Sequence, residues 1–300
     1  MQTILHSEII PQICKKNSYL LTKISDNCCQ ITNNDNKTTF VYYYDFNCNP
    51  NSNSWIARDK PTAYQFLKQN NVPAVEHIYV PYNNALNNAQ EYLKKHSSVV
   101  IKITNGTCGN NVFLCKSISS LNLTLSNLMK KGVSICVSPY IEYDEEFRVV
   151  LCNKKPEVIY AKKRPYVIGD GISTIAQLCK LKYPSLKLNQ NINQNVILQK
   201  NIKKNLIWKH NLCNGAIIEK VNNNALKKIL TNLALKACKL LNLNVCSIDI
   251  INNNGKLEIL EINSGLMMEN FYLANEFNKS TCLNIYEKAI NSSFIQLYPE

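Results

Sequence analysis

Residues 247–270 constrain the fold most, because they place carboxylates inside two strongly apolar runs. Asp249 lies between two isoleucines, and Glu261 lies between a leucine and an isoleucine, so both faces of each run are expected to be covered. A buried carboxylate must pair with a cation or bind a metal ion. An all-oxygen ligand set favours Mg²⁺ over a transition metal. The competing interpretation is that the two carboxylates line a solvated face of a sheet.

The segment between the two runs predicts a β-hairpin. Gly255 can supply the positive φ angle that a type I turn followed by a bulge requires. With a loop at residues 253–255, Asp249 lies opposite Ile259 and shares its face of the sheet with Glu261. Divalent cations could then bridge the two carboxylates diagonally. A four-residue loop would place them on opposite faces, so the chemistry predicts the shorter loop.

Composition indicates an ordinary globular protein of one or two domains, because 45% of the 300 residues are hydrophobic. No run approaches the roughly 18 apolar residues of a membrane span, and the first residues lack the features of a signal peptide. A cytoplasmic protein without a membrane partner is therefore expected. The 13 cysteines are scattered and odd in number, which favours reduced core residues over disulfides.

Two other classes of site receive little support. The four histidines are isolated from one another and show no zinc-ligand spacing. The net charge of +13 admits a polyanionic partner, but the lysines are dispersed in ones and twos rather than clustered with aromatic residues. Nucleic-acid binding is therefore an unfavoured alternative.

The first part of the chain, residues 1–54, is predicted to form a short leading module. A helix is expected over residues 9–15, with strands over 19–24 and 38–44. The Asn- and Ser-rich residues 49–54 predict a turn or linker. The module is too small for a complete domain, and it could contribute either to acceptor binding or to a homodimer contact.

The rest of the chain mixes predicted helices and strands, which indicates an α+β fold. Asp59 is the expected N-cap of the first helix, and Ser173 or Thr174 caps a later one. Helices are predicted over residues 59–68, 84–95, 121–130, 175–181 and 225–241, and strands over 99–103, 134–141, 147–151, 158–164 and 217–221.

Basic residues in predicted strands indicate a possible phosphate site. Lys102 is a charge inside an apolar strand and needs a partner. In the loop that follows, Gly106 and Gly109 would allow phosphate oxygens to approach the backbone, although two glycines often mark only a hairpin. Lys162 and Arg164 share one face of a later strand. Lysines that blunt an exposed edge strand are the alternative explanation for this second pair.

Several short motifs occur in a particular order along the chain. They are Arg58-Asp59-Lys60, Ile101-Lys102 before the glycine loop, Glu146-Phe147-Arg148, Gly169-Asp170-Gly171 before Thr174-Ile175, Asn211-Leu212, and Asp249 followed by Glu261-Ile262-Asn263. This order resembles the ATP-grasp ligases over roughly residues 55–275. The likeness is greatest to the ATP-grasp module of cyanophycin synthetase and of bifunctional glutathione synthetase.

The resemblance implies an ATP-grasp fold, in which two α+β subdomains clamp ATP. The ATP-grasp domain would span residues 55–300, with a lid at about 76–138 and a core subdomain at about 139–275. The implied activity is an ATP- and Mg²⁺-dependent, ADP-forming carboxylate–amine ligase that uses an acyl phosphate. Its substrates would be an amino acid, a peptide or a related small acid, together with an amine. A non-catalytic ATP-binding module is the main alternative.

The resemblance also implies a role for individual residues. The metal ligands would be Asp249, Glu261 and Asn263, holding two Mg²⁺ ions for which Mn²⁺ could substitute. The residues that act on the reacting groups would be Arg148, Lys162, Arg164 and Asn211. The residues that bind the nucleotide would be Lys60, Lys102, Gly106, Thr107, Gly109, Ser138, Pro139, Tyr140 and Ile141.

The sequence departs from the family pattern at three places. The family's Arg-x-Pro becomes Lys162-Lys163-Arg164-Pro165, which shifts the proline by one position. The loop at residues 211–216 loses a glycine and a hydroxyl, and residues 264–270 stand where Pro-Gly is usual. The last two segments are predicted to shape the substrate pocket.

Overall fold

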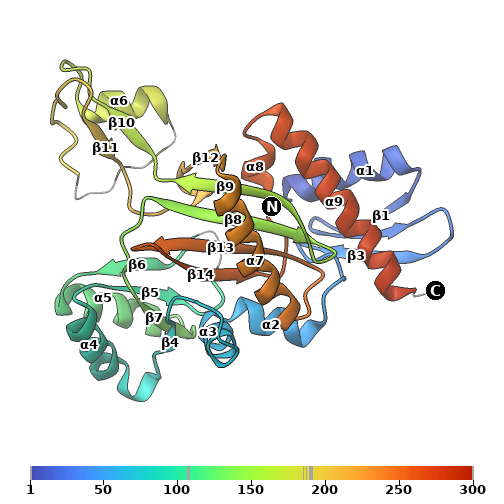
Figure 1. The fold of residues 1–300 in the computed structure, drawn as a ribbon, viewed down its shortest axis with the longest axis horizontal. Helices are drawn as coiled ribbons and strands as arrows, with labels where there is room; N and C mark the ends of the chain where they lie inside the picture. The colour runs from blue at the N-terminus through green and yellow to red at the C-terminus, as the bar shows by residue number, and fades with distance from the viewer. Residues whose placement is uncertain (1, 107–108, 185, 187, 189–191, 299–300) are drawn as a thin grey trace.

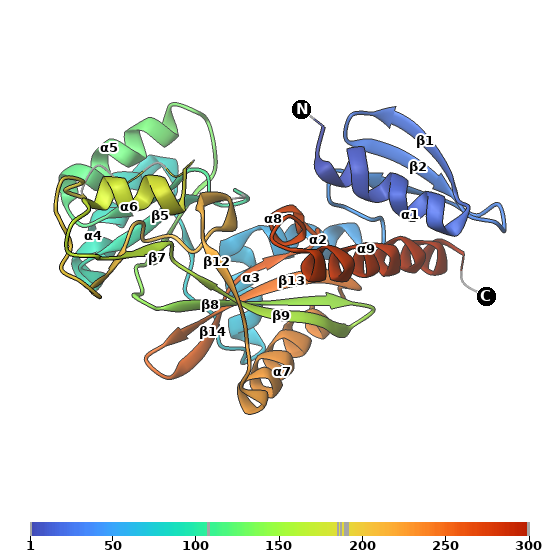
Figure 2. The same ribbon diagram turned by 90° about the horizontal axis from the view of Figure 1, so that it is seen from above.

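The computed structural model describes residues 2–106, 109–184, 186, 188 and 192–298. Within these residues a five-stranded sheet occupies the centre of the molecule (Figure 1). A four-stranded sheet with its helices lies on one side, and the leading residues lie with the C-terminal helix on the other (Figure 2). The mixture of helices and antiparallel sheets confirms the predicted α+β class.

The central sheet is antiparallel and has the strand order β12-β9-β8-β13-β14. Alternate residues of its strands serve its two faces. Phe147 and Val149 pack under helix α7 (Asn224–Leu240), whereas Arg148 and Val150 lie on the opposite face. The strands are β8 (Glu145–Cys152), β9 (Lys155–Lys163), β12 (Ile217–Lys220), β13 (Val245–Asn253) and β14 (Lys256–Asn263).

The four-stranded sheet, here called the lid, has the order β4-β7-β5-β6. Its helices α4 and α5 bury their apolar sides on one face of the sheet. Ser117 caps α5 in a reciprocal pair with Ser120. The elements are β4 (Ile78–Tyr79), a 3₁₀ turn (Tyr82–Asn84), α4 (Ala85–His96), β5 (Val99–Ile103), β6 (Val112–Cys115), α5 (Ile118–Met129) and β7 (Ile135–Pro139).

A small ribbon of β10 (Tyr166–Ile168) and β11 (Lys203–Asn205) carries helix α6 (Ile175–Lys182). Thr174 caps this helix, as predicted, by accepting a hydrogen bond from the Gln177 amide. The motif at residues 169–171 forms the turn before the helix, where Asp170 accepts hydrogen bonds from two following amides. In this chain the motif therefore shapes the ribbon and does not line the pocket described below.

The leading residues share one apolar core with the C-terminal helix α9 (Glu276–Leu297). This explains why the first 54 residues looked too small for a complete domain. Strand β2 and helix α9 were not predicted. The elements are a π-helical turn (Leu5–Ile9), α1 (Ile10–Asn17), β1 (Leu20–Ser25), β2 (Cys28–Thr32), β3 (Thr38–Tyr42) and, near the end of the chain, α8 (Glu269–Tyr272).

The prediction of a turn or linker at residues 49–54 is wrong, because helix α2 (Asn51–Arg58) begins there. Asn49 prepares its start: the side-chain amide donates to the carbonyls of Val245 and Ser264, at 2.7 and 2.8 Å. Tertiary packing on the central sheet thus overrides a turn-forming composition. Helix α3 (Lys60–Gln69) follows at once, with Asp59 as the predicted N-cap.

The predicted hairpin register is also wrong. The turn contains only two central residues, Asn254 and Gly255, both with positive φ (51° and 88°), so Asn253 pairs with Lys256. A bulge between Asp249 and Ile250 then shifts the pairing by one residue. As a result, Asp249 lies directly opposite Glu261 rather than diagonal to it. The shorter turn and the bulge each shift the pairing by one residue, so the two carboxylates still share one face of the sheet.

Two expectations from composition can be compared with the described residues. Among them, every cysteine is a free thiol. None of their helices combines the length and the apolar character that crossing a membrane requires.

Candidate active site

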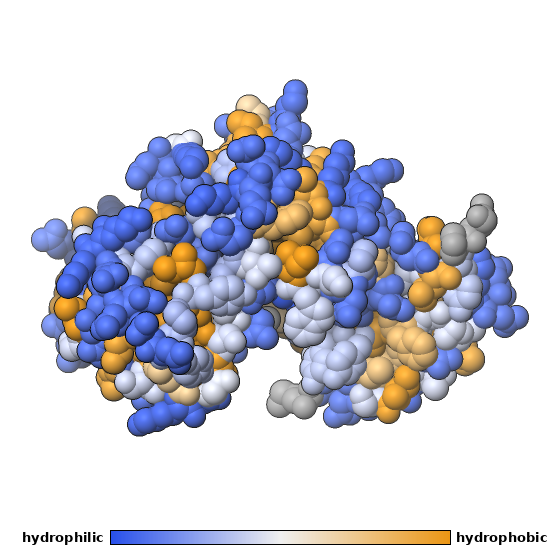
Figure 3. All heavy atoms as spheres, turned by 90° about the horizontal axis from the view of Figure 1, so that it is seen from below, coloured by the Kyte–Doolittle hydropathy of each residue, from blue (hydrophilic) through white to orange (hydrophobic). Residues whose placement is uncertain are grey.

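A pocket of about 510 Å³ lies among the lid, the central sheet and the leading residues. The molecular surface is hollowed between the lid and the leading residues (Figure 3). Thr107 lies outside the described residues. Every other predicted site residue lines the pocket: Lys60, Lys102, Gly106, Gly109, Ser138, Pro139, Tyr140, Ile141, Arg148, Lys162, Arg164, Asn211, Asp249, Glu261 and Asn263.

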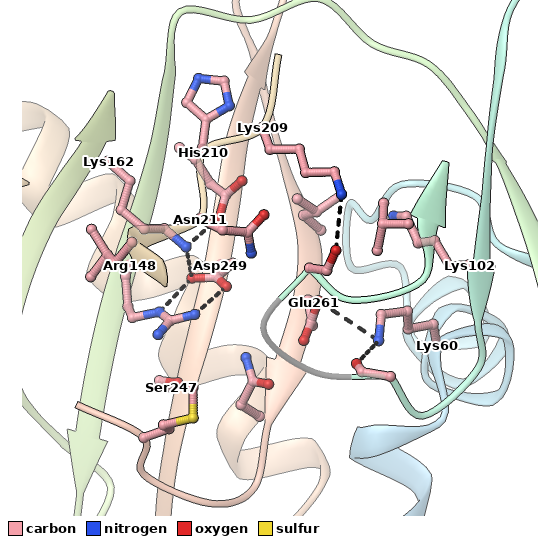
Figure 4. A pocket seen from close by; sticks show the side chains of 18 of the residues that line it. Lys60, Lys102, Arg148, Lys162, Lys209, His210, Asn211, Ser247, Asp249 and Glu261 are labelled. Atoms are coloured by element: carbon pink, nitrogen blue, oxygen red, sulfur yellow. Dashed lines mark hydrogen bonds and ion pairs between the residues drawn. The ribbon is translucent and has the colours of Figure 1, made fainter. Parts of the chain in front are cut away.

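Asp249 is the centre of a buried ionic cluster (Figure 4). Its Oδ1 and Oδ2 accept hydrogen bonds from Arg148 Nε and Nη2 at 2.7 and 2.6 Å, and Lys162 Nζ lies 3.1 Å from Oδ1. Lys162 also pairs with Glu146. Burial alone would raise the pKa of the Asp249 carboxyl, but Arg148 and Lys162 outweigh it and hold the pKa well below its ordinary value. Asp249 is therefore a carboxylate in the folded protein.

Arg164 was predicted to act beside Lys162, but it lies just beyond the end of β9. Its guanidinium pairs with Glu142 and, at 3.4 Å, with Asp144. It lines the pocket from outside the Asp249 cluster.

Glu261 and Asn263 line the pocket and carry the oxygen atoms that a metal ion would need. The nearest cation to Glu261 is Lys60, whose Nζ lies 3.8 Å from Oε2, and the amide nitrogen of Asn263, which cannot bind Mg²⁺, is buried without a hydrogen-bond partner. Each oxygen of Asp249 keeps part of its lone-pair capacity, and the whole donor set is oxygen, which suits Mg²⁺. Among the described residues, no group of three or more His, Cys, Asp or Glu side chains could hold a metal ion by itself, so Asn263 or a bound ligand would have to complete a site here.

Three lysines at the lid side of the pocket have neutral partners. Lys60 Nζ donates to the Gly106 carbonyl and Lys209 Nζ donates to the Gly109 carbonyl, both at 3.0 Å. Lys102 Nζ lies 3.0 Å from His77 Nε2. These partners orient the three ammonium groups without neutralising their charge. The one described carboxylate that pairs with any of them is Glu261, 3.8 Å from Lys60.

The glycine loop touches the loop that carries Asn211. Gly109 adopts φ +65°, and a Cβ at this position would lie 2.5 Å from Asn211 Oδ1. The positive φ favours glycine here, and the glycine loop and the loop that carries Asn211 approach closely at this point.

Residues 138–141 form a further wall of the pocket. Ser138 and Pro139 belong to strand β7, and the Tyr140 amide donates to the Ser98 carbonyl at 3.0 Å. The rings of Tyr140 and Trp208 pack in a T-shaped arrangement, with their centroids 5.8 Å apart.

Sequence reasoning missed several residues of the pocket. Lys209 lies in a segment interpreted only as a polar loop, although its tryptophan and histidine neighbours also line the pocket. Burial lowers the pKa of His210 to about 4, so the ring is neutral near pH 7. The leading residues supply a turn at residues 42–45, where Tyr42 and Asp45 exchange two backbone hydrogen bonds of 3.0 Å. No local motif signals that this turn lines the same pocket as β14, which is here called the metal strand after the predicted ligands Glu261 and Asn263.

Arg58 joins that turn to the segment after the metal strand. Its Nε donates to Ser264 Oγ at 2.7 Å, and its Nη2 lies 3.1 Å from Asp45 Oδ2. The Leu266 amide also donates to the Tyr44 carbonyl at 3.1 Å. The predicted substrate-pocket residues at 264–270 therefore lie against the leading residues.

Comparison with solved structures finds the same fold in several ligases. The D-alanine–D-alanine ligase from Bacillus anthracis shows 16% identity and a TM-score of 0.56, with 80% of this chain and 67% of that chain covered. The bifunctional glutathione synthetase from Pasteurella multocida shows 14% identity and a TM-score of 0.59, with 95% and 44% covered. This chain thus spans less than half of that synthetase. At such identities the likeness shows the fold.

The ATP-grasp ligase PsnB, solved with a phosphomimetic variant of its minimal precursor, Mg and ADP, shows 12% identity and a TM-score of 0.50, with 84% and 62% covered. No curated protein matches the sequence. The sequence model of the RimK-like ATP-grasp domain matches residues 57–170 and 191–291, which is most of the chain. The protein therefore belongs to the RimK-like ATP-grasp family.

Proposed function

We propose that this protein is an ADP-forming ligase that uses ATP and Mg²⁺ to join a carboxylate to an amine through an acyl phosphate. ATP-dependent carboxylate–amine ligation is the general activity of ATP-grasp ligases. The observation that carries the proposal is the charge of the pocket. Among the described residues, its lining has three more cationic than anionic side chains, which suits a nucleotide polyphosphate. Its charged lining residues are Arg58, Lys60, Lys102, Arg148, Lys162, Arg164 and Lys209, against Asp45, Glu146, Asp249 and Glu261.

The lid side of the pocket is the proposed nucleotide site. Lys60, Lys102 and Lys209 would contact phosphate oxygens, because their hydrogen-bond partners are neutral. Within the part of the chain that the structure describes, the only carboxylate paired with them, Glu261, lies 3.8 Å from Lys60. The glycine loop would lie over the phosphates. Adenine would lie against residues 138–141 and meet backbone groups beyond β7, because the backbone of Ser138 and Pro139 is paired with β5.

The proposed Mg²⁺ site lies on the paired strands β13 and β14, with Glu261 and Asn263 as ligands and Asp249 as a ligand that also anchors Arg148. One or two ions would fit, and Mn²⁺ accepts the same oxygen donors. When bound, the ions would neutralise charge on the phosphates.

Arg148, Lys162, Arg164 and Asn211 would orient and stabilise the reacting groups. The substrate carboxylate would attack the terminal phosphorus of ATP, forming an acyl phosphate and releasing ADP. A neutral amine would then attack the carbonyl carbon, so that phosphate leaves, the amide bond forms and the amine loses a proton. Such transfer depends on positioning and charge rather than on a protein nucleophile.

The substrates would be an amino acid, a peptide or a related small acid. The precursor bound to PsnB is one example of a peptide in this fold. Their proposed place is the end of the pocket between the turn at 42–45 and residues 264–270, where Arg58 can meet a carboxylate. Residues 55–300 would then form the ATP-grasp domain, with the lid at about 76–138, the core at about 139–275, and the leading module completing the acceptor end.

The direct test is ADP release from ATP in the presence of a panel of acids and amines, with and without Mg²⁺. Formation of ADP that depends on one acid and one amine is the expected result. ATP binding without ADP release across a broad panel would favour the alternative of a non-catalytic nucleotide-binding module. Hydroxylamine can replace the amine in the same assay, since it traps an acyl phosphate as a hydroxamate.

Gly109→Ala is expected to raise the KM for ATP by roughly tenfold, because it combines a left-handed alanine, which costs about 1–2 kcal/mol, with a collision at Asn211. Steady-state kinetics measures the change. Gly132→Ala is the matched control: Gly132 has the same φ of +65°, but a Cβ there meets nothing within 4 Å. Equal kinetics of the two variants would show that the contact with Asn211 has no role in closing the pocket.

A further inference from the structure

His77 lies in the segment between helix α3 and the lid, next to residues that hydrogen-bond to β14. Just before it, the Val75 amide donates to the Ile259 carbonyl of β14 at 2.8 Å. Just after it, Ile78 and Tyr79 form β4 and pair with β7 of the lid. His77 is thus held between the strand that carries Glu261 and the sheet that carries Lys102.

The hydrogen bonds of His77 define its tautomer. Its ring is 1% exposed, and Nδ1 lies 3.0 Å from the Val75 carbonyl, which can only accept a proton. Nδ1 therefore carries the hydrogen, and the lone pair of Nε2 faces Lys102 Nζ at 3.0 Å. Burial lowers the pKa of His77, and the charge of Lys102 lowers it further, so the ring is neutral.

A neutral acceptor has a different effect from a carboxylate. Lys162 and Arg148 face Asp249 and Glu146, which cancel much of their charge. His77 instead fixes the direction of one Lys102 N–H bond and leaves the positive charge and two other N–H donors for a ligand.

We propose that His77 is a positioning residue that directs the ammonium group of Lys102 toward a nucleotide phosphate. It also keeps this ammonium group in a fixed position relative to the metal strand. The proposal rests on the proposed function only in taking this pocket as a nucleotide site. His77 does not itself line the pocket, so it acts through Lys102.

Three substitutions separate positioning from packing. His77→Gln can keep a neutral acceptor, His77→Leu removes it, and His77→Glu replaces it with a negative charge. Binding of ADP and of adenosine to each purified variant is measured by calorimetry, because only ADP carries phosphate. His96→Glu is the matched control, since it adds the same charge to the lid at a residue outside the pocket.

His77→Glu and His77→Leu are expected to weaken ADP binding on the order of tenfold while adenosine binding changes little. His77→Gln and the control should bind ADP within about threefold of the wild type. If His77→Glu does not fold, the comparison of His77→Leu with His77→Gln still decides. Equal loss of ADP and adenosine, or no loss in any variant, would overturn the proposal. Failure of the unaltered protein to bind ADP would overturn the nucleotide site itself.

Discussion

Replacing Asp249 with alanine is expected to lower the free energy of unfolding by about 3–5 kcal/mol, because it leaves two buried cations without their shared carboxylate. The side chains of Arg148 and Lys162 are only 17% and 3% exposed, so water can replace Asp249 only in part, on the pocket side of Arg148. Urea unfolding followed by circular dichroism measures the change. Asp249 would thus be essential for stability as well as for catalysis, so its loss alone cannot identify a metal ligand.

Asp26→Ala is the matched control for this prediction. Asp26 pairs with Lys23, but their side chains are 61% and 59% exposed, so the loss of Asp26 should leave the free energy of unfolding nearly unchanged. Similar stability of the two variants would contradict the structural role of the Asp249 cluster.

The pH dependence of the free energy of unfolding is a second test of the Asp249 cluster. Burial raises the pKa of Asp249, the two cations lower it more, and the net pKa lies below the ordinary value of 3.8. Its stabilising contribution is therefore complete above that pH and is lost as the pH falls further. The stability difference between the wild type and Asp249→Ala should narrow in this acidic range.

Local signals in the sequence predicted the elements that depend on local structure. The strand predicted at residues 99–103 coincides with β5, because a short apolar run with one charge leaves little choice of register. The cap at Asp59 likewise places the start of α3 correctly, since the side chain satisfies an amide within the first turn.

Elements stabilised by distant parts of the chain could not be predicted in the same way. Helix α9 buries polar residues such as Asn278, Ser292 and Ser293 beside its apolar ones, so its sequence lacks a clean apolar stripe. Strand β2 is short, and its buried Cys29 and Ile31 pack on that same helix region. Both depend on contacts that join the two ends of the chain.

The candidate site likewise has residues that local motifs predict and features that depend on contacts between distant parts of the chain. The order of motifs along the chain names many of the residues that line the pocket, among them Lys60 at the start of α3, Arg148 within β8 and Asp249 within β13. Two features stayed hidden: the bulge that sets Asp249 opposite Glu261, and the turn at residues 42–45. Both depend on tertiary pairing rather than on local composition.

Asp249 on β13 and Glu261 on β14 have different partners in the folded protein. Asp249 already serves Arg148 and Lys162, whereas the nearest cation to Glu261 is Lys60 at 3.8 Å. An isosteric change at Glu261 therefore leaves Arg148 and Lys162 paired with Asp249. It removes the charge that would bind Mg²⁺ and the 3.8 Å contact of that charge with Lys60.

Glu261→Gln is expected to reduce Mg²⁺-dependent turnover by about 10²–10³-fold, because charge stabilisation in the transition state is lost, while stability stays within about 0.5 kcal/mol of the wild type. Turnover is measured as ADP release with the acid and amine that the panel identifies. A readout that needs neither the acid nor the amine is ATP binding: Mg²⁺ should strengthen the binding of ATP to the wild type but not to the variant. Glu258→Gln makes the same change on the same strand, outside the pocket, and should keep both properties. Retention of the Mg²⁺ effect by Glu261→Gln would show that the metal is held elsewhere.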